Sequence, residues 1–180
     1  MNLWSEVQYR LVNHFDEVDN YAAGLKSVYH NGKVNHWIFE AADADKFDSA
    51  VCNDREASPG HELRAFFRWL SLGAVKNELD FDEPPRVVEL GGFACEGILT
   101  QLLCDGGAYA RFNSDEITRA RQLSFACMTS LFGSELNRVR AFVTYDYWCK
   151  WFHDSGWDVA IFALEKSRRR WWILCATDFD

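Results

Sequence analysis

Residues 159–176 read VAIFALEKSRRRWWILCA, and this stretch decides what the rest of the chain has to cover. Residues 159–164 are apolar at every position, and so are residues 171–176. Since successive side chains of a β-strand point to opposite faces of the sheet, both faces of these runs have to be buried, as in interior strands. The charged residues 165–170 predict a turn between them, with its three arginines exposed. The stretch therefore predicts a two-stranded hairpin at the heart of a sheet.

Two other parts of the chain predict the remaining strands. Asn31-Gly32 supplies the positive φ angles that a tight hairpin turn needs, so residues 25–30 and 34–41 are predicted to pair as antiparallel strands. Residues 138–144 form one further β-like segment. Together these segments predict an antiparallel or mixed sheet of about five strands, built from two hairpins and one further strand.

Apolar residues at helical spacing predict the elements that pack on this sheet. The predicted helices are residues 3–15, 61–79, a segment ending at 105–107, 114–133 and 145–154, with 43–54 as a short acidic helix or an ordered loop. A break is predicted at residues 57–60. The fold class expected is α+β, with four to five helices packed on the sheet in one globular domain that covers residues 1–180.

The charge of the chain is acidic and uneven. The formal net charge is −8, and residues 1–90 hold 9 Lys and Arg against 16 Asp and Glu. Phosphate binding needs clustered cations, so this balance argues against a nucleic-acid partner. It suits a basic protein partner, which an acidic surface would attract, although simple solubility would also explain the charge.

The cysteines and the first residues bear on the compartment. None of the six cysteines forms a C-x-x-C pair, and most lie within apolar runs, as Cys104 and Cys175 do. The first residues, MNLWSE, lack the basic and apolar regions of a secretory signal, and no uncharged run is long enough to cross a bilayer. We expect buried, reduced thiols in a cytoplasmic protein that has no membrane partner and no cofactor.

Residues 86–104, RVVELGGFACEGILTQLLC, contain the most motif-like stretch. An apolar run ends in Glu89 and is followed by glycine and a helical segment, and here the chain resembles the first motif of class I methyltransferases. The residues that carry the resemblance are Val87, Val88, Glu89, Leu90, Gly91, Ile98 and Leu99. The resemblance implies binding of S-adenosylmethionine. Where that family has alternate glycines, this chain has Gly91, Phe93 and Cys95. The bulky Phe93 would block the approach of backbone to a cofactor.

Two pairs of residues have the chemical character needed for catalysis or metal binding. Cys149 and His153 would lie one turn apart on a helix and could form a nucleophilic dyad, although a thiol amid aromatic residues stays neutral. His30 and His36 flank the predicted turn but lack further metal ligands.

Five aspartates lie within the last part of the chain. They could form an acid pair or a divalent-metal site, as a carboxylate-using hydrolase would need, or simply be solvated. These residues are Asp146, Asp154, Asp158, Asp178 and Asp180.

An acidic loop follows residues 61–79, and we expect it to be the surface that binds a partner. Its predicted binding residues are Glu78, Asp80, Phe81, Asp82 and Glu83.

In size, acidity and its Trp-rich C-terminal region, the chain resembles the immunity proteins that bacteria carry against contact-delivered toxins. That resemblance implies a cytoplasmic inhibitor that covers the active site of a basic toxin domain. The alternative is an enzyme, either a divergent methyltransferase or a hydrolase that uses carboxylates.

Overall fold

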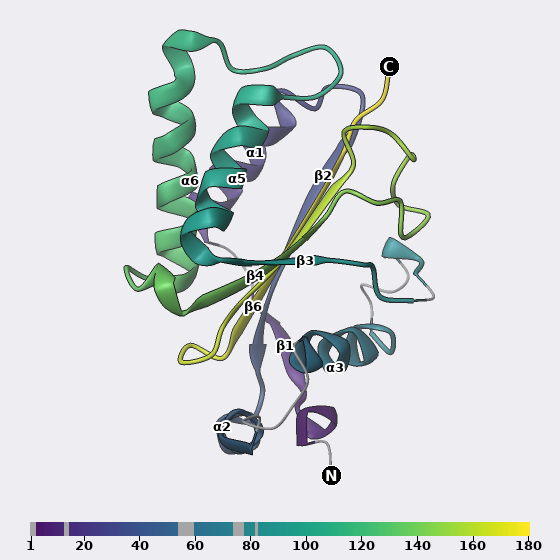
Figure 1. Ribbon diagram of the computed structural model, residues 1–180, viewed down its shortest axis with the longest axis vertical. Coiled ribbons are helices and arrows are strands. Elements are labelled where there is room, and N and C mark those ends of the chain that lie inside the picture. The colour runs from purple at the N-terminus through teal and green to yellow at the C-terminus, as the bar shows by residue number, and fades with distance from the viewer. Residues whose placement is uncertain (1–2, 13–14, 54–59, 74–77, 82) are drawn as a thin grey trace.

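The computed structural model describes residues 3–12, 15–53, 60–73, 78–81 and 83–180. These residues form an α+β fold, with six strands in one sheet and five α-helices (Figure 1). The strands are β1 (Tyr9–Val12), β2 (Lys33–Ala41), β3 (Val88–Gly91), β4 (Val139–Thr144), β5 (Val159–Glu165) and β6 (Arg170–Thr177). The α-helices are α1 (Asp16–Lys26), α2 (Ala44–Asn53), α3 (His61–Leu70), α5 (Gly92–Asp105) and α6 (Ile117–Phe132). Short 3-10 turns are η1 (Leu3–Glu6), η3 (Ser114–Glu116) and η4 (Leu136–Arg138).

The sheet is antiparallel throughout its described strands, in the order β1-β2-β6-β5-β4-β3. The predicted C-terminal hairpin is confirmed: β5 pairs with β6 from Val159↔Ala176 to Glu165↔Arg170. Both strands are interior, with β2 and β4 as their outer neighbours. The prediction of about five strands was one short: β1 and the edge strand β3 were not foreseen, whereas the predicted strand at residues 25–30 is not a strand.

One face of the sheet is covered by α1, α5 and α6, which Figure 1 shows together on one side. The inward residues of β5 on this face are Val159, Ile161 and Ala163, and they are almost fully buried. Gly24 of α1 lies close to Leu123 of α6, so a side chain there would crowd the contact between the two helices. This layer forms the larger of the two hydrophobic cores.

The second face is covered by η1, α2, α3 and the irregular segments around residues 79–81 and 148–152. Here the ring of Phe66 in α3 stacks on the indole of Trp171 in β6, with centroids 4.4 Å apart and planes 3° from parallel. Both side chains are fully buried. Two covered faces explain why residues 159–164 and 171–176 are apolar at every position.

The predicted N-terminal helix over residues 3–15 is wrong. The chain instead forms the short turn η1 and then β1, which pairs with β2 from Tyr9↔Ala41 to Val12↔Ile38. Trp4 is buried against Phe47 of α2, at 5.2 Å between ring centroids. Pairing with a strand some thirty residues ahead therefore overrides the local helical spacing.

The predicted hairpin around Asn31-Gly32 is also wrong in its first half. Residues 25 and 26 belong to α1, in which Val18, Tyr21 and Leu25 form one buried face, and residues 27–30 form the turn and loop that follow this helix. The second half, β2, pairs with β1 and β6. Gly32 is needed for a different reason, because a Cβ there would collide with the backbone carbonyl of Thr177.

Residues 145–154 are not helical, in contrast to the prediction. They form a chain of turns in which Cys149, Trp151 and Phe152 are buried on the second face of the sheet. The ring of Trp148 contacts Phe162 of β5 at 5.8 Å between centroids. Trp148, Trp151 and Phe152 thus belong to the second core without forming a helix, whereas Tyr145 and Tyr147 are exposed.

The arginine-rich turn between β5 and β6 is only partly exposed. Arg168 is exposed, whereas Arg169 and Arg170 are half-buried. Arg169 donates two hydrogen bonds to the carboxylate of Asp48, at 2.9 and 2.7 Å, and Arg170 bonds to Glu40 and to the backbone carbonyl of Leu131. The three arginines therefore do not form an exposed basic cluster.

Candidate functional site

Four segments meet at one end of the sheet, where β2 begins, β4 ends, β5 begins and β6 ends. We call this surface the loop end; it comprises residues 27–32, 105–113, 145–158 and 177–180. The buried carboxylate of Asp178 holds these segments together. It accepts hydrogen bonds from the backbone N–H groups of Asn31, at 2.9 Å, and Ala108, at 2.8 Å. The hydroxyl of Ser155 donates to the backbone carbonyl of Asp178 at 2.6 Å.

Asp158 is the second buried carboxylate of the loop end. It accepts hydrogen bonds from the backbone N–H and the hydroxyl of Ser155, each at 3.1 Å, and from the hydroxyl of Thr177 at 2.5 Å. The chain's own donors therefore satisfy both buried carboxylates, as buried polar groups require. Their evident role is to fix the loops.

The other three aspartates that the sequence singled out, Asp146, Asp154 and Asp180, are exposed at the same end. Among the described residues, no three His, Cys, Asp or Glu side chains are arranged to hold a metal ion. The structure thus brings the five aspartates to one end of the sheet but divides them into two buried carboxylates and three surface ones.

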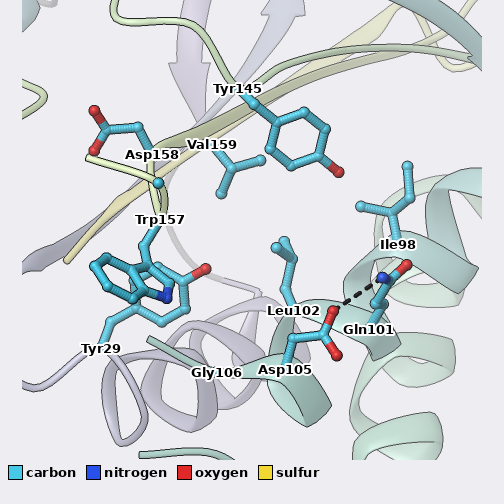
Figure 2. Close-up of a pocket in the computed structure, with 11 residues that line it drawn as sticks. Tyr29, Ile98, Gln101, Leu102, Asp105, Gly106, Tyr145, Trp157, Asp158 and Val159 are labelled. Atoms are coloured by element: carbon cyan, nitrogen blue, oxygen red, sulfur yellow. Dashed lines mark hydrogen bonds between the residues drawn. The ribbon is translucent and has the colours of Figure 1, made fainter. Parts of the chain in front are cut away.

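A pocket of about 310 Å³ opens at the loop end, between the C-terminal part of α5 and the start of β5 (Figure 2). Its lining residues are Tyr29, Ile98, Gln101, Leu102, Asp105, Gly106, Tyr145, Gly156, Trp157, Asp158 and Val159. Gln101 donates a hydrogen bond from Nε2 to Oδ2 of Asp105 at 2.9 Å. Figure 2 shows the carboxylate of Asp158 pointing away from the pocket, consistent with its bonds to Ser155 and Thr177.

The electrostatic environment of this pocket is negative. Burial raises the pKa of the Tyr29 hydroxyl. The charges of Asp178, Asp105 and Asp158 and the nearby hydroxyl of Tyr145 raise this pKa further. Burial and the charge of Asp105 likewise raise the pKa of Tyr145. Both phenols are therefore neutral near pH 7, and the pocket favours a positively charged ligand.

The loop end also carries exposed aromatic side chains, of which Tyr145 belongs to the pocket lining. Tyr109, Tyr145, Tyr147 and Phe179 are 64%, 56%, 49% and 38% exposed. The ring of Phe179 lies against His153, with 4.6 Å between centroids. Exposed aromatic rings beside carboxylates form a surface that can recognise a protein, since Tyr residues are enriched among the strongest contacts of interfaces.

The predicted binding loop differs in part from expectation. Phe81 is 3% exposed and lies against Trp148, at 5.4 Å between centroids, so the expectation of an exposed aromatic ring is wrong. Its hydrophobic contacts on the second face of the sheet explain this burial. Glu78 accepts a hydrogen bond from Asn35, and Asp80 bonds to Lys150 at 2.7 Å.

The other two predicted binding residues are acidic. Glu83 is exposed, and Asp82 lies outside the described residues, as does most of the predicted break at residues 57–60. The structure thus leaves the acidic character of this loop at the surface but removes its aromatic part.

The proposed nucleophilic dyad is not assembled. Cys149 is buried, and burial raises the pKa of its thiol to about 11, so it is protonated near neutral pH. His153 is exposed and lies against Phe179. The two histidines considered as metal ligands lie in different surroundings. His30 is exposed, whereas the ring of His36 is hydrogen-bonded to the carboxylate of Asp19 at 3.0 Å.

The methyltransferase-like segment forms β3 and the start of α5. This strand lies at the sheet edge and pairs in antiparallel fashion with β4 in the described sheet, whereas the glycine loop of a doubly wound fold follows a strand of a parallel sheet. Glu89 forms an ion pair with Arg140 at 2.7 Å. Phe93 lies in the first turn of α5, and its side chain is 66% exposed. Gly92 is required by packing, because a Cβ there would collide with the backbone of Leu136.

None of the helices in the described parts of the chain has the length and apolar character needed to cross a membrane. Comparison of the chain with family models, with curated proteins and with solved structures gives no match.

Proposed function

We propose that this chain is a cytoplasmic inhibitor that binds a basic protein partner, in the manner of the immunity proteins that neutralise bacterial toxins. The observation that carries the proposal is the composition of the loop end. It holds six aspartates, of which Asp158 and Asp178 are buried, against Arg111 and Lys150 and two histidines, His30 and His153. Lys150 bonds to Asp80, which offsets its charge. The surface is therefore acidic as well as aromatic.

Such a surface suits rapid and tight recognition of a basic protein. Carboxylates attract an oppositely charged partner and raise the association rate, whereas aromatic side chains supply most of the affinity once contact is made. The buried bonds of Asp158 and Asp178 hold the loops in place before binding, which lowers the cost of ordering them. A preformed loop surface of this kind is what an inhibitor that covers an active site requires.

The cysteines support the cytoplasmic part of the proposal. All six are free, and Cys95, Cys127, Cys149 and Cys175 are buried. Thiols that remain reduced are typical of proteins in the cytoplasm.

The test is co-expression with the product of the adjacent gene, followed by the mass of the purified species. We expect a stoichiometric complex. The double variant Asp146→Lys with Asp180→Lys should weaken it at least tenfold, because it reverses two exposed charges of the loop end. Its matched control is Glu6→Lys with Glu17→Lys, which makes the same change in net charge at exposed positions of η1 and α1, away from the loop end.

Two results would contradict the proposal: no complex, or a complex that both double variants weaken equally. The enzyme alternative has its own readout, since a ligand that binds the native state raises the Tm. A rise in Tm with S-adenosylmethionine would favour the methyltransferase, and a rise with a divalent ion would favour the hydrolase.

A further inference from the structure

The pocket at the loop end is small and carries an acidic group without a basic neighbour in its lining. Its volume of about 310 Å³ lies at the lower limit for small-molecule sites. Of the eleven lining residues, none is Lys, Arg or His. Asp105 uses Oδ2 to accept the hydrogen bond from Gln101, and no hydrogen bond within the described residues occupies its Oδ1.

A second and independent feature is the hydroxyl of Tyr29. This side chain is 2% exposed, and Figure 2 shows its hydroxyl directed into the pocket. No described residue forms a hydrogen bond with that hydroxyl. The hydroxyl oxygen faces the open space of the pocket, so a group that enters the pocket can form a hydrogen bond with it. Asp105 and Tyr29 thus present two acceptor oxygens to the same space.

The side chains that line the pocket further restrict which ligand fits it. The lining includes two aromatic rings, those of Tyr145 and Trp157, and the aliphatic side chains of Ile98, Leu102 and Val159 (Figure 2). A cation with an apolar stem fits such walls, because the stem lies on apolar surface while the charge faces a ring or a carboxylate. A phosphate or a carboxylate does not fit, since the charges of Asp105, Asp158 and Asp178 would oppose it.

From these contacts we infer that the pocket receives one arginine side chain of the basic partner, with the guanidinium bound to Asp105 and the Tyr29 hydroxyl. Arginine is preferred to lysine because its planar group has several fixed N–H donors and stacks on aromatic rings. The identity of the occupant as a partner side chain rests on the proposed function. The preference for a guanidinium rests on the pocket alone.

The first test uses N-acetyl-arginine amide as the probe and the full chain labelled with ¹⁵N. We expect a saturable shift of the Trp157 indole N–H signal. The affinity should fall about tenfold in Asp105→Asn, which keeps the shape of the side chain but removes its charge. Asp180→Asn, an exposed carboxylate of the loop end outside the pocket lining, should bind as the parent does. N-acetyl-norleucine amide, which has an apolar stem and no charge, should not produce the shift, and N-acetyl-lysine amide should bind more weakly.

The pocket inference is overturned by a titration without saturation, or by equal affinities in the parent and Asp105→Asn. An unchanged Tm and an unchanged spectrum away from the pocket would show that Asp105→Asn is folded. The probe requires no partner, so this result is separate from the co-expression test.

The second test measures the partner complex with the same Asp105→Asn variant. A loss of about tenfold or more supports the partner's arginine as the occupant. If the probe binds but the complex is unaffected, the pocket binds free guanidinium compounds and the assignment to the partner is overturned. If the probe binds and no complex exists, the proposed function fails while the chemistry of the pocket stands.

Discussion

The carboxylate of Asp178 accepts a hydrogen bond at 2.8 Å from the backbone N–H of Ala108, a residue 70 positions earlier in the chain. Gly107, next to Ala108, has no room for a Cβ, because that atom would collide with the same carboxylate. The C-terminal tail and the α5–η3 loop are thus fitted to each other at the loop end.

Replacing Asp178 with Ala should destabilise the fold by about 3 kcal/mol or more. The substitution leaves the buried N–H groups of Asn31 and Ala108 without an acceptor, and such groups cost free energy when they lose a charged partner. Urea unfolding should show a lower midpoint with an unchanged m-value. Asp180→Ala, at an exposed position two residues on, should change the free energy of unfolding by no more than about 0.5 kcal/mol. Equal effects of the two substitutions would contradict this role for Asp178.

The stacked pair of Phe66 and Trp171 should be among the most sensitive contacts of the second core. Phe66→Ala removes a fully buried ring and leaves a cavity over β6, so we expect a loss of about 3–5 kcal/mol in the free energy of unfolding. The matched control is Phe93→Ala, which removes the same ring at a position that is 66% exposed. That control should cost less than about 1 kcal/mol. A similar loss for both variants would show that the stacked contact does not anchor α3 to the sheet.

The central hairpin could be predicted from the sequence because its information is local. Residues 159–164 and 171–176 are apolar at every position, and only a strand buried on both faces requires this. The errors arose where distant contacts decide the structure. Leu11 has the spacing of a helical residue but belongs to an edge strand, and Gly32 is a glycine because Thr177 lies beside it.

The pocket could not be predicted from the sequence for the same reason, because distant segments form it. Asp158 was singled out as part of a carboxylate group, but Tyr29 and Asp105 lie in segments far apart along the chain and have no local motif. The one available signal was the Asp105-Gly106-Gly107 sequence, which predicts the end of a helix. Gly106, with a φ of 68°, does end α5, as predicted. That the same turn brings Asp105 to a pocket with Tyr29 depends on the tertiary packing of α1 against α5.

Stability should fall as the pH rises above about 9. Burial raises the pKa of the Cys95 thiol to about 12, with a smaller effect from Glu96, and burial raises those of Cys127 and Cys175 well above their ordinary value. The unfolded chain loses these protons from about pH 8.5, whereas the folded chain retains them, so the unfolded state is favoured as pH rises. Each such thiol contributes a slope of about −1.4 kcal/mol per pH unit in that window.

Cys95→Ala isolates one of these thiols. The parent and the variant should be compared by urea unfolding between pH 8 and about 10.5. The variant should be less stable at pH 8 because it lacks a buried side chain, but its stability should fall less steeply with pH. Cys52→Ala, at an exposed thiol, should retain the slope of the parent. Identical slopes for the parent and Cys95→Ala would contradict the assignment.

The acidic loop at residues 78–83 should contribute to the rate of association and little to the lifetime of the complex. Its carboxylates include Asp80 and Glu83, which are exposed, whereas its ring at Phe81 is buried and cannot serve as a contact. Charge reversal of Asp80 and Glu83, together with Asp82, should therefore slow association with a basic partner several-fold at low salt. The effect should be much smaller at high salt, where exposed charges are screened.

Tyr147→Ala, at the loop end, should instead speed dissociation, since contacts made after docking act mainly on that rate. Both rates can be read from surface-immobilised partner at two salt concentrations. An association rate that is unchanged at low salt would remove the acidic loop from the binding surface and leave the loop end as the site of recognition.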